Sequence, residues 1–108
     1  MDKYVNEGFE KLATRLRGEI RWDTPTLLQY ATDASAYREI PKAVVWPQDK
    51  GDLQELVSFA RMQCLTLTPR TAGTSLAGQV VSNGIIVDLS KHWGKIIEVN
   101  QHERYVWV

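Results

Sequence analysis

The chain has 108 residues, of which 44% are hydrophobic, so it is long enough for one domain and apolar enough to pack a core. Its 13 basic and 13 acidic residues cancel, which argues against a nucleic-acid or membrane-surface role, since both favour a basic face. No apolar run approaches the roughly 20 residues of a membrane span, and the N-terminal MDKYVNEGFEKL lacks the apolar core of a signal peptide. We expect a cytoplasmic protein or part of one, with no nucleic-acid partner and no membrane span.

The first elements along the chain are predicted to be helices. Apolar residues recur at helical spacing, and Gly18 is placed to end this helix in a left-handed conformation. A short second helix is predicted over TPTLLQYATDAS, with Thr24 as N-cap and Pro25 at the first helical position. Residues 1–38 would form a helical lead, and residues 39–108 the domain proper. The stripe of the first helix consists of Val5, Phe9, Leu12, Ala13 and Leu16.

A strand, a helix and a second strand follow. KAVVWP is apolar and β-branched and predicts a strand. The segment DKGDLQELVSFARMQ predicts a helix whose start carries an approximate capping box, Asp49 and Asp52. CLTLTP predicts the next strand, and such a βαβ unit is parallel and right-handed. The apolar stripe of the helix consists of Leu53, Leu56, Val57 and Ala60.

The remaining predicted elements complete an α/β fold. GIIVDLS predicts a strand, and KIIEVN and RYVWV predict a hairpin joined by a polar turn. We therefore expect a small parallel sheet flanked by helices, with a C-terminal hairpin. Because the chain ends in strand composition, we expect a domain truncated at its C-terminus. Its open apolar strand would let the isolated chain self-associate through residues 105–108.

The cysteine and histidine content predicts no metal site and no catalytic residue. Cys64 is the single cysteine, which excludes an internal disulfide, and we expect a buried, inert thiol. His92 and His102 are isolated in the sequence, whereas a metal site needs several convergent donors. Both histidines are expected in surface turns.

A glycine-rich, almost uncharged segment, TPRTAGTSLAGQVVSNG, separates the strands CLTLTP and GIIVDLS. Gly73 and Gly78 have the spacing of the first half of a P-loop, but Gln79 and Val80 replace its lysine and hydroxyl residue. Backbone N–H groups of such a turn can still surround a phosphate, and glycines remove Cβ atoms that would block its approach. A mobile surface loop is the alternative that the local pattern leaves open.

The stretch PRTAGTSLAGQ resembles the FAD pyrophosphate-binding loop of the vanillyl-alcohol oxidase and p-cresol methylhydroxylase flavoprotein superfamily. The resemblance is to the branch of D-lactate dehydrogenase and the glycolate oxidase D-subunit, where the usual form is Pro-Arg-Gly-Gly-Gly-Thr-Ser-Leu-Ala-Gly-Gln. PKAVVWPQDKGDLQELVSFA resembles the segment before that loop, and GIIVDLSK with IIEVN resembles the strands after it. The likeness covers roughly residues 30–108. It implies the first α/β subdomain of an FAD-binding domain in a flavin-linked dehydrogenase or oxidase of a 2-hydroxy acid, of the D-lactate or glycolate type.

The resemblance also implies which residues would touch the cofactor and which partners the chain would have. Thr74 stands where some members carry the histidine that bonds the flavin, so FAD is expected to be non-covalent. The partners would be the remainder of the FAD domain and a cap domain; the chain alone would be inactive and would hold FAD weakly or not at all. The residues implied to wrap the FAD diphosphate are Arg70, Thr71, Ala72, Gly73, Thr74 and Ser75, with Gly78 and Gln79 closing the loop.

A non-catalytic interaction module that kept the fold and lost the cofactor is the rival interpretation. Thr71 and Ala72 replace glycines of the usual motif, which favours the rival because it puts close approach there in question. The intact run GTSLAGQ favours the flavoprotein.

Overall fold

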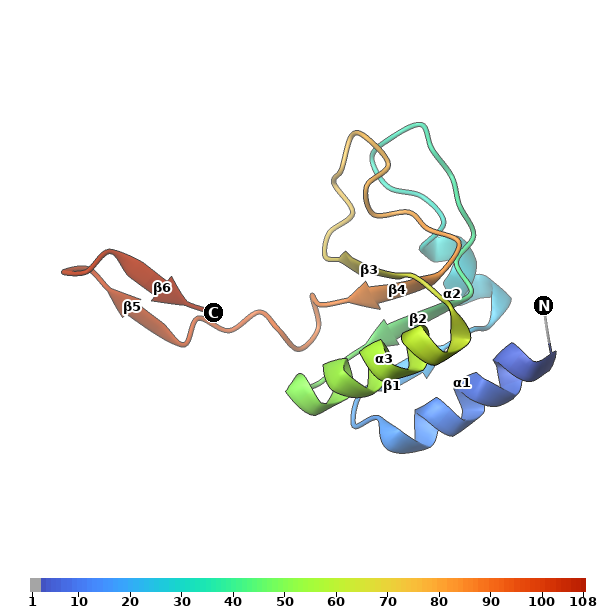
Figure 1. The fold of residues 1–108 in the computed structure, drawn as a ribbon. Coiled ribbons are helices and arrows are strands. Elements are labelled where there is room, and N and C mark those ends of the chain that lie inside the picture. Colours follow the sequence, from blue (N-terminus) through green and yellow to red (C-terminus); the bar gives the residue numbers. More distant parts are fainter. Residues whose placement is uncertain (1–2) are drawn as a thin grey trace.

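A four-stranded sheet forms the centre of the computed structural model, which describes residues 3–108 (Figure 1). Its strands are β1 (Glu19–Arg21), β2 (Ala43–Trp46), β3 (Leu67–Arg70) and β4 (Ile85–Asp88), in the order β1-β2-β4-β3. Strands β2 and β3 both run parallel to β4, and β1 pairs antiparallel with β2. The predicted α/β fold with a small parallel sheet is confirmed; β4 lies between the two strands of the βαβ unit.

Two helices cover one face of this sheet, α1 (Lys3–Arg15) and α3 (Lys50–Gln63). The other face packs against the short helix α2 (Thr24–Gln29), with Leu27 on Val44 and Ile86. Alternation along the strands separates the two faces, because successive side chains of a strand point to opposite sides. The core on the α1 and α3 side consists of Phe9, Leu12, Ile20, Ala43, Val45, Leu56, Ile85 and Val87.

The N-terminal segment departs from the sequence prediction at three points. Strand β1 was not predicted, and it adds Ile20 to the core. Gly18 does not take the left-handed conformation; a Cβ there would instead collide with the carbonyl oxygen of Trp46 on the neighbouring strand. The N-cap of α2 is Asp23 rather than Thr24, since its carboxylate accepts the Thr26 N–H at 3.2 Å.

Helix α3 has the predicted N-cap and ends at Gln63 as predicted, but the cysteine that follows it differs from the prediction. Asp49 is its N-cap and accepts the Asp52 N–H at 2.9 Å. Its C-cap is Cys64, in a left-handed conformation with φ of 53°, and the thiol is exposed rather than buried as predicted. Two residues assigned to apolar stripes are also exposed, Ala13 on α1 and Val57 on α3.

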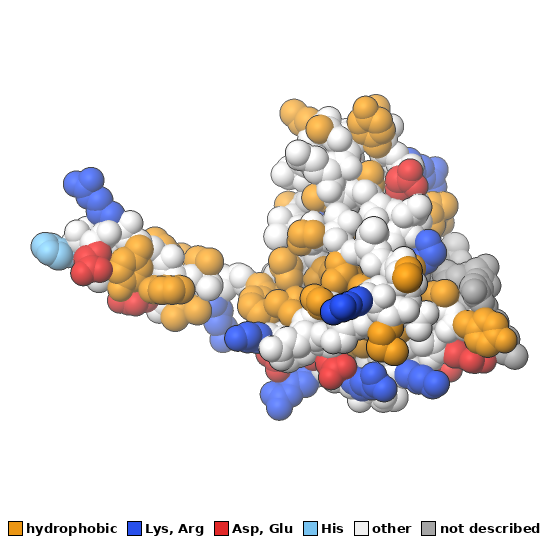
Figure 2. All heavy atoms as spheres, viewed as in Figure 1, with side chains coloured by type: hydrophobic (Ala, Val, Ile, Leu, Met, Phe, Trp, Pro, Cys, Tyr) orange, Lys and Arg blue, Asp and Glu red, His pale blue; other side chains and the backbone are white. Residues whose placement is uncertain are grey.

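The C-terminal hairpin consists of β5 (Glu98–Asn100) and β6 (Tyr105–Trp107) and projects away from the sheet (Figure 1). Figure 2 shows hydrophobic side chains gathered along this projection. Val99, Val106 and Trp107 are all more than half exposed there. Across residues 3–108, no helix is long and apolar enough to cross a membrane.

Candidate functional site

The predicted site lies in the loop that leaves β3 at Arg70 and returns to β4 at Ile85. This loop and the segment 31–42 rise together on the side of the sheet away from α1 and α3 (Figure 1). We call residues 70–79 the glycine loop and residues 30–39 the supporting segment. All eight of the predicted site residues belong to the glycine loop.

The two predicted glycines, Gly73 and Gly78, both have φ of +72°, a region that favours glycine. A Cβ on Gly73 would lie 2.5 Å from the Arg70 guanidinium, and one on Gly78 would lie 2.7 Å from the Tyr37 ring. Both missing side chains would therefore point toward the protein. The glycines let the loop pack closely on its own support, and this reason differs from the predicted one, which was room for a ligand.

Thr71 and Ala72 cause no backbone strain. Among residues 3–108, the non-glycine residues with positive φ are Cys64 and Arg104. The backbone at Thr71 and Ala72 thus does not need the glycines that the usual motif has there, and both side chains are exposed. The replacement that favoured the rival interpretation leaves the loop conformation intact.

Backbone N–H groups of the glycine loop are available to a ligand. Within the described part of the chain, the N–H groups of residues 71–76 and 78 have no hydrogen-bond acceptor. The N–H groups of Ala77 and Gln79 each donate to the Ser75 hydroxyl at 3.3 Å. That hydroxyl donates in turn to the Gln79 side-chain carbonyl at 3.1 Å, which closes the end of the loop.

Arg70 holds the base of the glycine loop on the sheet. Its guanidinium carbon lies 5.2 Å from the centre of the Tyr30 ring, and its Nη1 donates to the Tyr30 carbonyl at 3.4 Å. The Tyr30 hydroxyl donates to Oδ2 of Asp88 at 2.5 Å. Burial, together with this carboxylate, raises the pKa of Tyr30 to about 12, so the phenol stays protonated and donates.

Asp88 is a buried anchor, only 5% exposed. Its second oxygen accepts the Ser90 N–H at 2.8 Å and the Ser90 hydroxyl at 2.6 Å. Burial by itself raises the pKa of the Asp88 carboxyl, but the hydrogen bonds from Ser90 and Tyr30 outweigh it, and the pKa lies below its usual value. Asp88 is therefore ionised at neutral pH.

The supporting segment was not predicted as part of the site. The Ala34 N–H donates to the Gly73 carbonyl at 3.0 Å, and the Tyr37 ring lies against Gly78. The segment folds on itself because Asp33 accepts the Ser35 N–H at 2.7 Å. The hydrogen bond from Ser35 contributes most to holding the pKa of the Asp33 carboxyl below its usual value. An Asp two residues before a Ser is a turn signal that was present in the sequence, but it does not say what the turn contacts.

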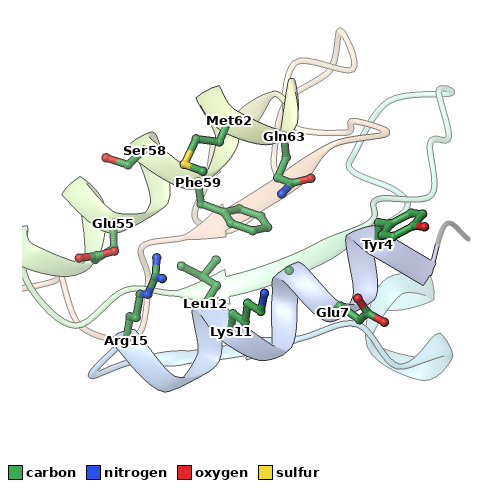
Figure 3. A pocket seen from close by; sticks show the side chains of 11 residues that line it. Tyr4, Glu7, Lys11, Leu12, Arg15, Glu55, Ser58, Phe59, Met62 and Gln63 are labelled. Atoms are coloured by element: carbon green, nitrogen blue, oxygen red, sulfur yellow. The ribbon is translucent and has the colours of Figure 1, made fainter.

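One cavity adjoins the site, and another lies on the opposite face of the sheet. A hollow of about 370 Å³ opens between the supporting segment and the glycine loop; its lining residues are Tyr37, Arg38, Glu39, Ala77, Gly78 and Val81. A second cavity of about 370 Å³ lies between α1 and α3, on the other face of the sheet, and mixes charged with apolar side chains (Figure 3). Within residues 3–108, no three His, Cys, Asp or Glu side chains come close enough to hold a metal ion.

Comparison with known proteins gives a matching family model, sequence relatives and solved structures of similar fold. A protein-family model described as an FAD-binding domain matches residues 41–108. D-2-hydroxyglutarate dehydrogenase of Pseudomonas putida is 42% identical over 95 residues, which cover 85% of this chain and 9% of that protein. The protein of the same name from Haemophilus influenzae is 35% identical over the whole chain, which covers 11% of it.

Solved structures agree on the fold. The 4-ethylphenol oxidase from Gulosibacter chungangensis superposes with a TM-score of 0.76 at 20% identity, covering 98% of this chain and 22% of the oxidase. An alkyldihydroxyacetonephosphate synthase superposes with a TM-score of 0.74 at 18% identity, covering 91% of this chain and 21% of the synthase. The chain thus spans about a tenth of the length of the two sequence relatives above and about a fifth of these structures.

Proposed function

The chain belongs to the FAD-binding domain family, and from this premise we propose that the glycine loop binds the diphosphate of FAD through its backbone N–H groups. FAD is the cofactor of the family. The observation that carries the proposal is the set of N–H groups at residues 71–76 and 78, which have no acceptor among residues 3–108. Backbone N–H groups gathered in one glycine-rich loop suit an anion that carries several oxygens.

Charge supports the same placement. The Arg70 guanidinium lies directly behind Gly73, on the protein side of the loop. A cation there attracts a diphosphate through the loop without contacting it. The hydroxyl groups of Thr74 and Ser75 add donors on the same loop. Thr74 cannot form the covalent bond to the flavin that a histidine forms at this place in some members of the superfamily, so FAD is bound non-covalently in this proposal.

The reaction proposed for the protein that contains this chain is the oxidation of a 2-hydroxy acid. The relatives that are 35–42% identical carry the name D-2-hydroxyglutarate dehydrogenase. A glycolate oxidase subunit and a D-lactate dehydrogenase are less similar, at 29% and 27% identity. A 2-hydroxy acid of the 2-hydroxyglutarate type is therefore preferred to D-lactate or glycolate as the substrate. Bound FAD would accept the electrons of the substrate, while the residues of this chain bind and orient the cofactor.

Placing a negative charge on the glycine loop tests diphosphate binding without disturbing the packing. The Ala72 side chain is exposed, so Ala72→Glu keeps the loop conformation and sets a carboxylate beside the diphosphate. We expect the dissociation constant for FAD to rise by about tenfold or more, because the new carboxylate would repel the negatively charged diphosphate beside it. The measurement is a titration of the apoprotein that contains this chain with FAD, followed by flavin fluorescence.

Ala13→Glu is the matched control. Ala13 is exposed on α1, on the other side of the sheet, and the substitution adds the same charge. We expect its FAD affinity to stay within about twofold of the wild type. Equal affinities of the Ala72→Glu and Ala13→Glu variants would refute the proposal, because FAD would then bind with its diphosphate away from this loop. A wild-type protein that binds no FAD would favour an interaction module that has lost the cofactor.

A further inference from the structure

We propose that Tyr30 is a positioning residue for the FAD-binding loop: its ring carries the Arg70 guanidinium beneath Gly73, and its hydroxyl fixes that ring on Asp88. This inference rests on the proposed function of the glycine loop. It extends the site to a residue outside the matched range 41–108. Tyr30 comes from the C-terminal end of α2, so the segment before the matched domain would contribute to the cofactor site.

The register of β3 and β4 places the two charged residues that contact Tyr30 next to each other. Arg70 and Asp88 are paired residues at the ends of β3 and β4. The salt bridges found among the described residues do not include this pair. The Tyr30 phenol serves both groups instead, with the cation over its ring at 5.2 Å and the carboxylate at its hydroxyl at 2.5 Å.

The Tyr30 ring has a second contact that holds its orientation. It meets the Trp46 ring edge-on, with centroids 5.9 Å apart and an interplanar angle of 82°. Edge-to-face packing of this kind is favourable for aromatic pairs. The ring is thus held by Trp46 and by Asp88, and the face that it offers to Arg70 is fixed.

Arg70 connects the fixed Tyr30 ring to the backbone of the glycine loop, because its guanidinium packs against Gly73. Its guanidinium fills the space that a side chain on residue 73 would take, which is why Gly73 fits there. The Gly73 carbonyl is held by the Ala34 N–H at 3.0 Å. Gly73 is therefore held by two contacts, with the Arg70 guanidinium and with the Ala34 N–H. Ala34 belongs to the supporting segment, and Arg70 packs on Tyr30 of the same segment. The N–H groups next to Gly73 would keep one orientation before any ligand arrives, and pre-organisation of this kind raises affinity.

A double-mutant cycle on the protein that contains this chain tests the inference. Tyr30→Leu removes the ring, Tyr30→Phe removes only the hydroxyl, and Arg70→Met removes the cation that the ring supports. We expect the dissociation constant for FAD to rise about tenfold in Tyr30→Leu and about threefold in Tyr30→Phe, which keeps the ring. In the Arg70→Met background, Tyr30→Phe and Tyr30→Leu should add little, because Tyr30 acts through Arg70.

The control is Phe59→Leu, which removes an aromatic ring packed on Phe9 in the other half of the core. It should lower the melting temperature and leave FAD affinity within about twofold of the wild type. Tyr30→Leu with the affinity of Phe59→Leu would overturn the inference. The inference would also be overturned if the fold-increases in the FAD dissociation constant caused by the Tyr30 and Arg70 substitutions multiplied in the double variant. Where Tyr30→Leu fails to fold, the same cycle with Tyr30→Phe decides.

Ala72→Glu separates this inference from the proposed function. If Ala72→Glu weakens FAD binding and the Tyr30 variants do not, the loop binds the diphosphate and Tyr30 has no positioning role. If Ala72→Glu binds FAD as well as the wild type, the proposed function fails, and the role of Tyr30 fails with it.

Discussion

The carboxylate of Asp52 joins three parts of the chain. It is 2% exposed and accepts backbone N–H groups from Arg17, Gly18 and Gln48 at 2.8–2.9 Å. Burial by itself raises the pKa of this carboxyl, but the hydrogen bonds from Gln48, Arg17 and Gly18 outweigh it and hold the pKa below its usual value. A carboxyl whose pKa is lower in the folded than in the unfolded chain stabilises the fold above its unfolded pKa. That stability is lost as the pH falls through the folded pKa.

Asp52→Asn should therefore destabilise the fold in a pH-dependent way. The amide cannot accept at both ends, so we expect a loss of about 1–3 kcal/mol in the free energy of unfolding at pH 7. The difference from wild type should shrink as the pH falls below about 4. Urea unfolding across this range measures it, with Glu10→Gln on the exposed side of α1 as the control for charge. A difference that stays constant down to pH 2.5 would contradict the role of the ionised carboxylate.

Residues that act within their own helix end were predicted in part, since Asp49 was found and Asp23 was not, and residues that act across the fold were missed. Asp49 was predicted as a cap because its partner lies three residues away. The partners of Asp52 at Arg17 and Gly18 lie 34–35 residues away, so no local pattern reveals them. Tyr30 was missed for the same reason, because Asp88 is 58 residues from it. For the glycine loop, the residues came from the family resemblance, and their support came only from the structure.

Elements with a continuous apolar run or a clear apolar period were predictable, and the three-residue strand β1 was not. Strands β2 and β4 are runs of buried β-branched residues, and α3 has a cap and a stripe. Strand β1 has three residues with one buried side chain, Ile20, which is too short to show a period. Its existence depends on pairing with β2, a contact between distant parts of the chain. The short helix α2 was predicted in type, but its end was placed too late.

The hairpin β5–β6 carries the prediction of self-association. Val106 is 53% exposed and Trp107 is 60% exposed, so this projection offers apolar surface and open strand edges to another chain. We expect the 108-residue chain to be a dimer or larger at micromolar concentration and Trp107→Lys to shift it toward monomer. Size exclusion with light scattering measures this, with Met62→Lys on α3 as a control at an exposed apolar site outside the hairpin. A wild-type chain that elutes as a single monomeric species would rule out the hairpin as a self-association surface.

Across the whole molecule, the two faces of the sheet have different roles. Helices α1 and α3 cover one face and provide most of the core. The other face carries α2, the supporting segment and the glycine loop, where the network of Arg70, Tyr30 and Asp88 lies. The chain would bind one part of FAD, and the rest of a protein about ten times longer in its relatives would complete the site.

In the proposed function, the glycine loop holds the FAD diphosphate. A crystal structure of the protein that contains this chain, purified with FAD bound, tests it most directly. We predict diphosphate oxygens within about 3.2 Å of backbone nitrogens among residues 71–76 and 78, with Arg70 still stacked on Tyr30. FAD bound with its diphosphate away from this loop, and with those N–H groups facing water, would contradict the account.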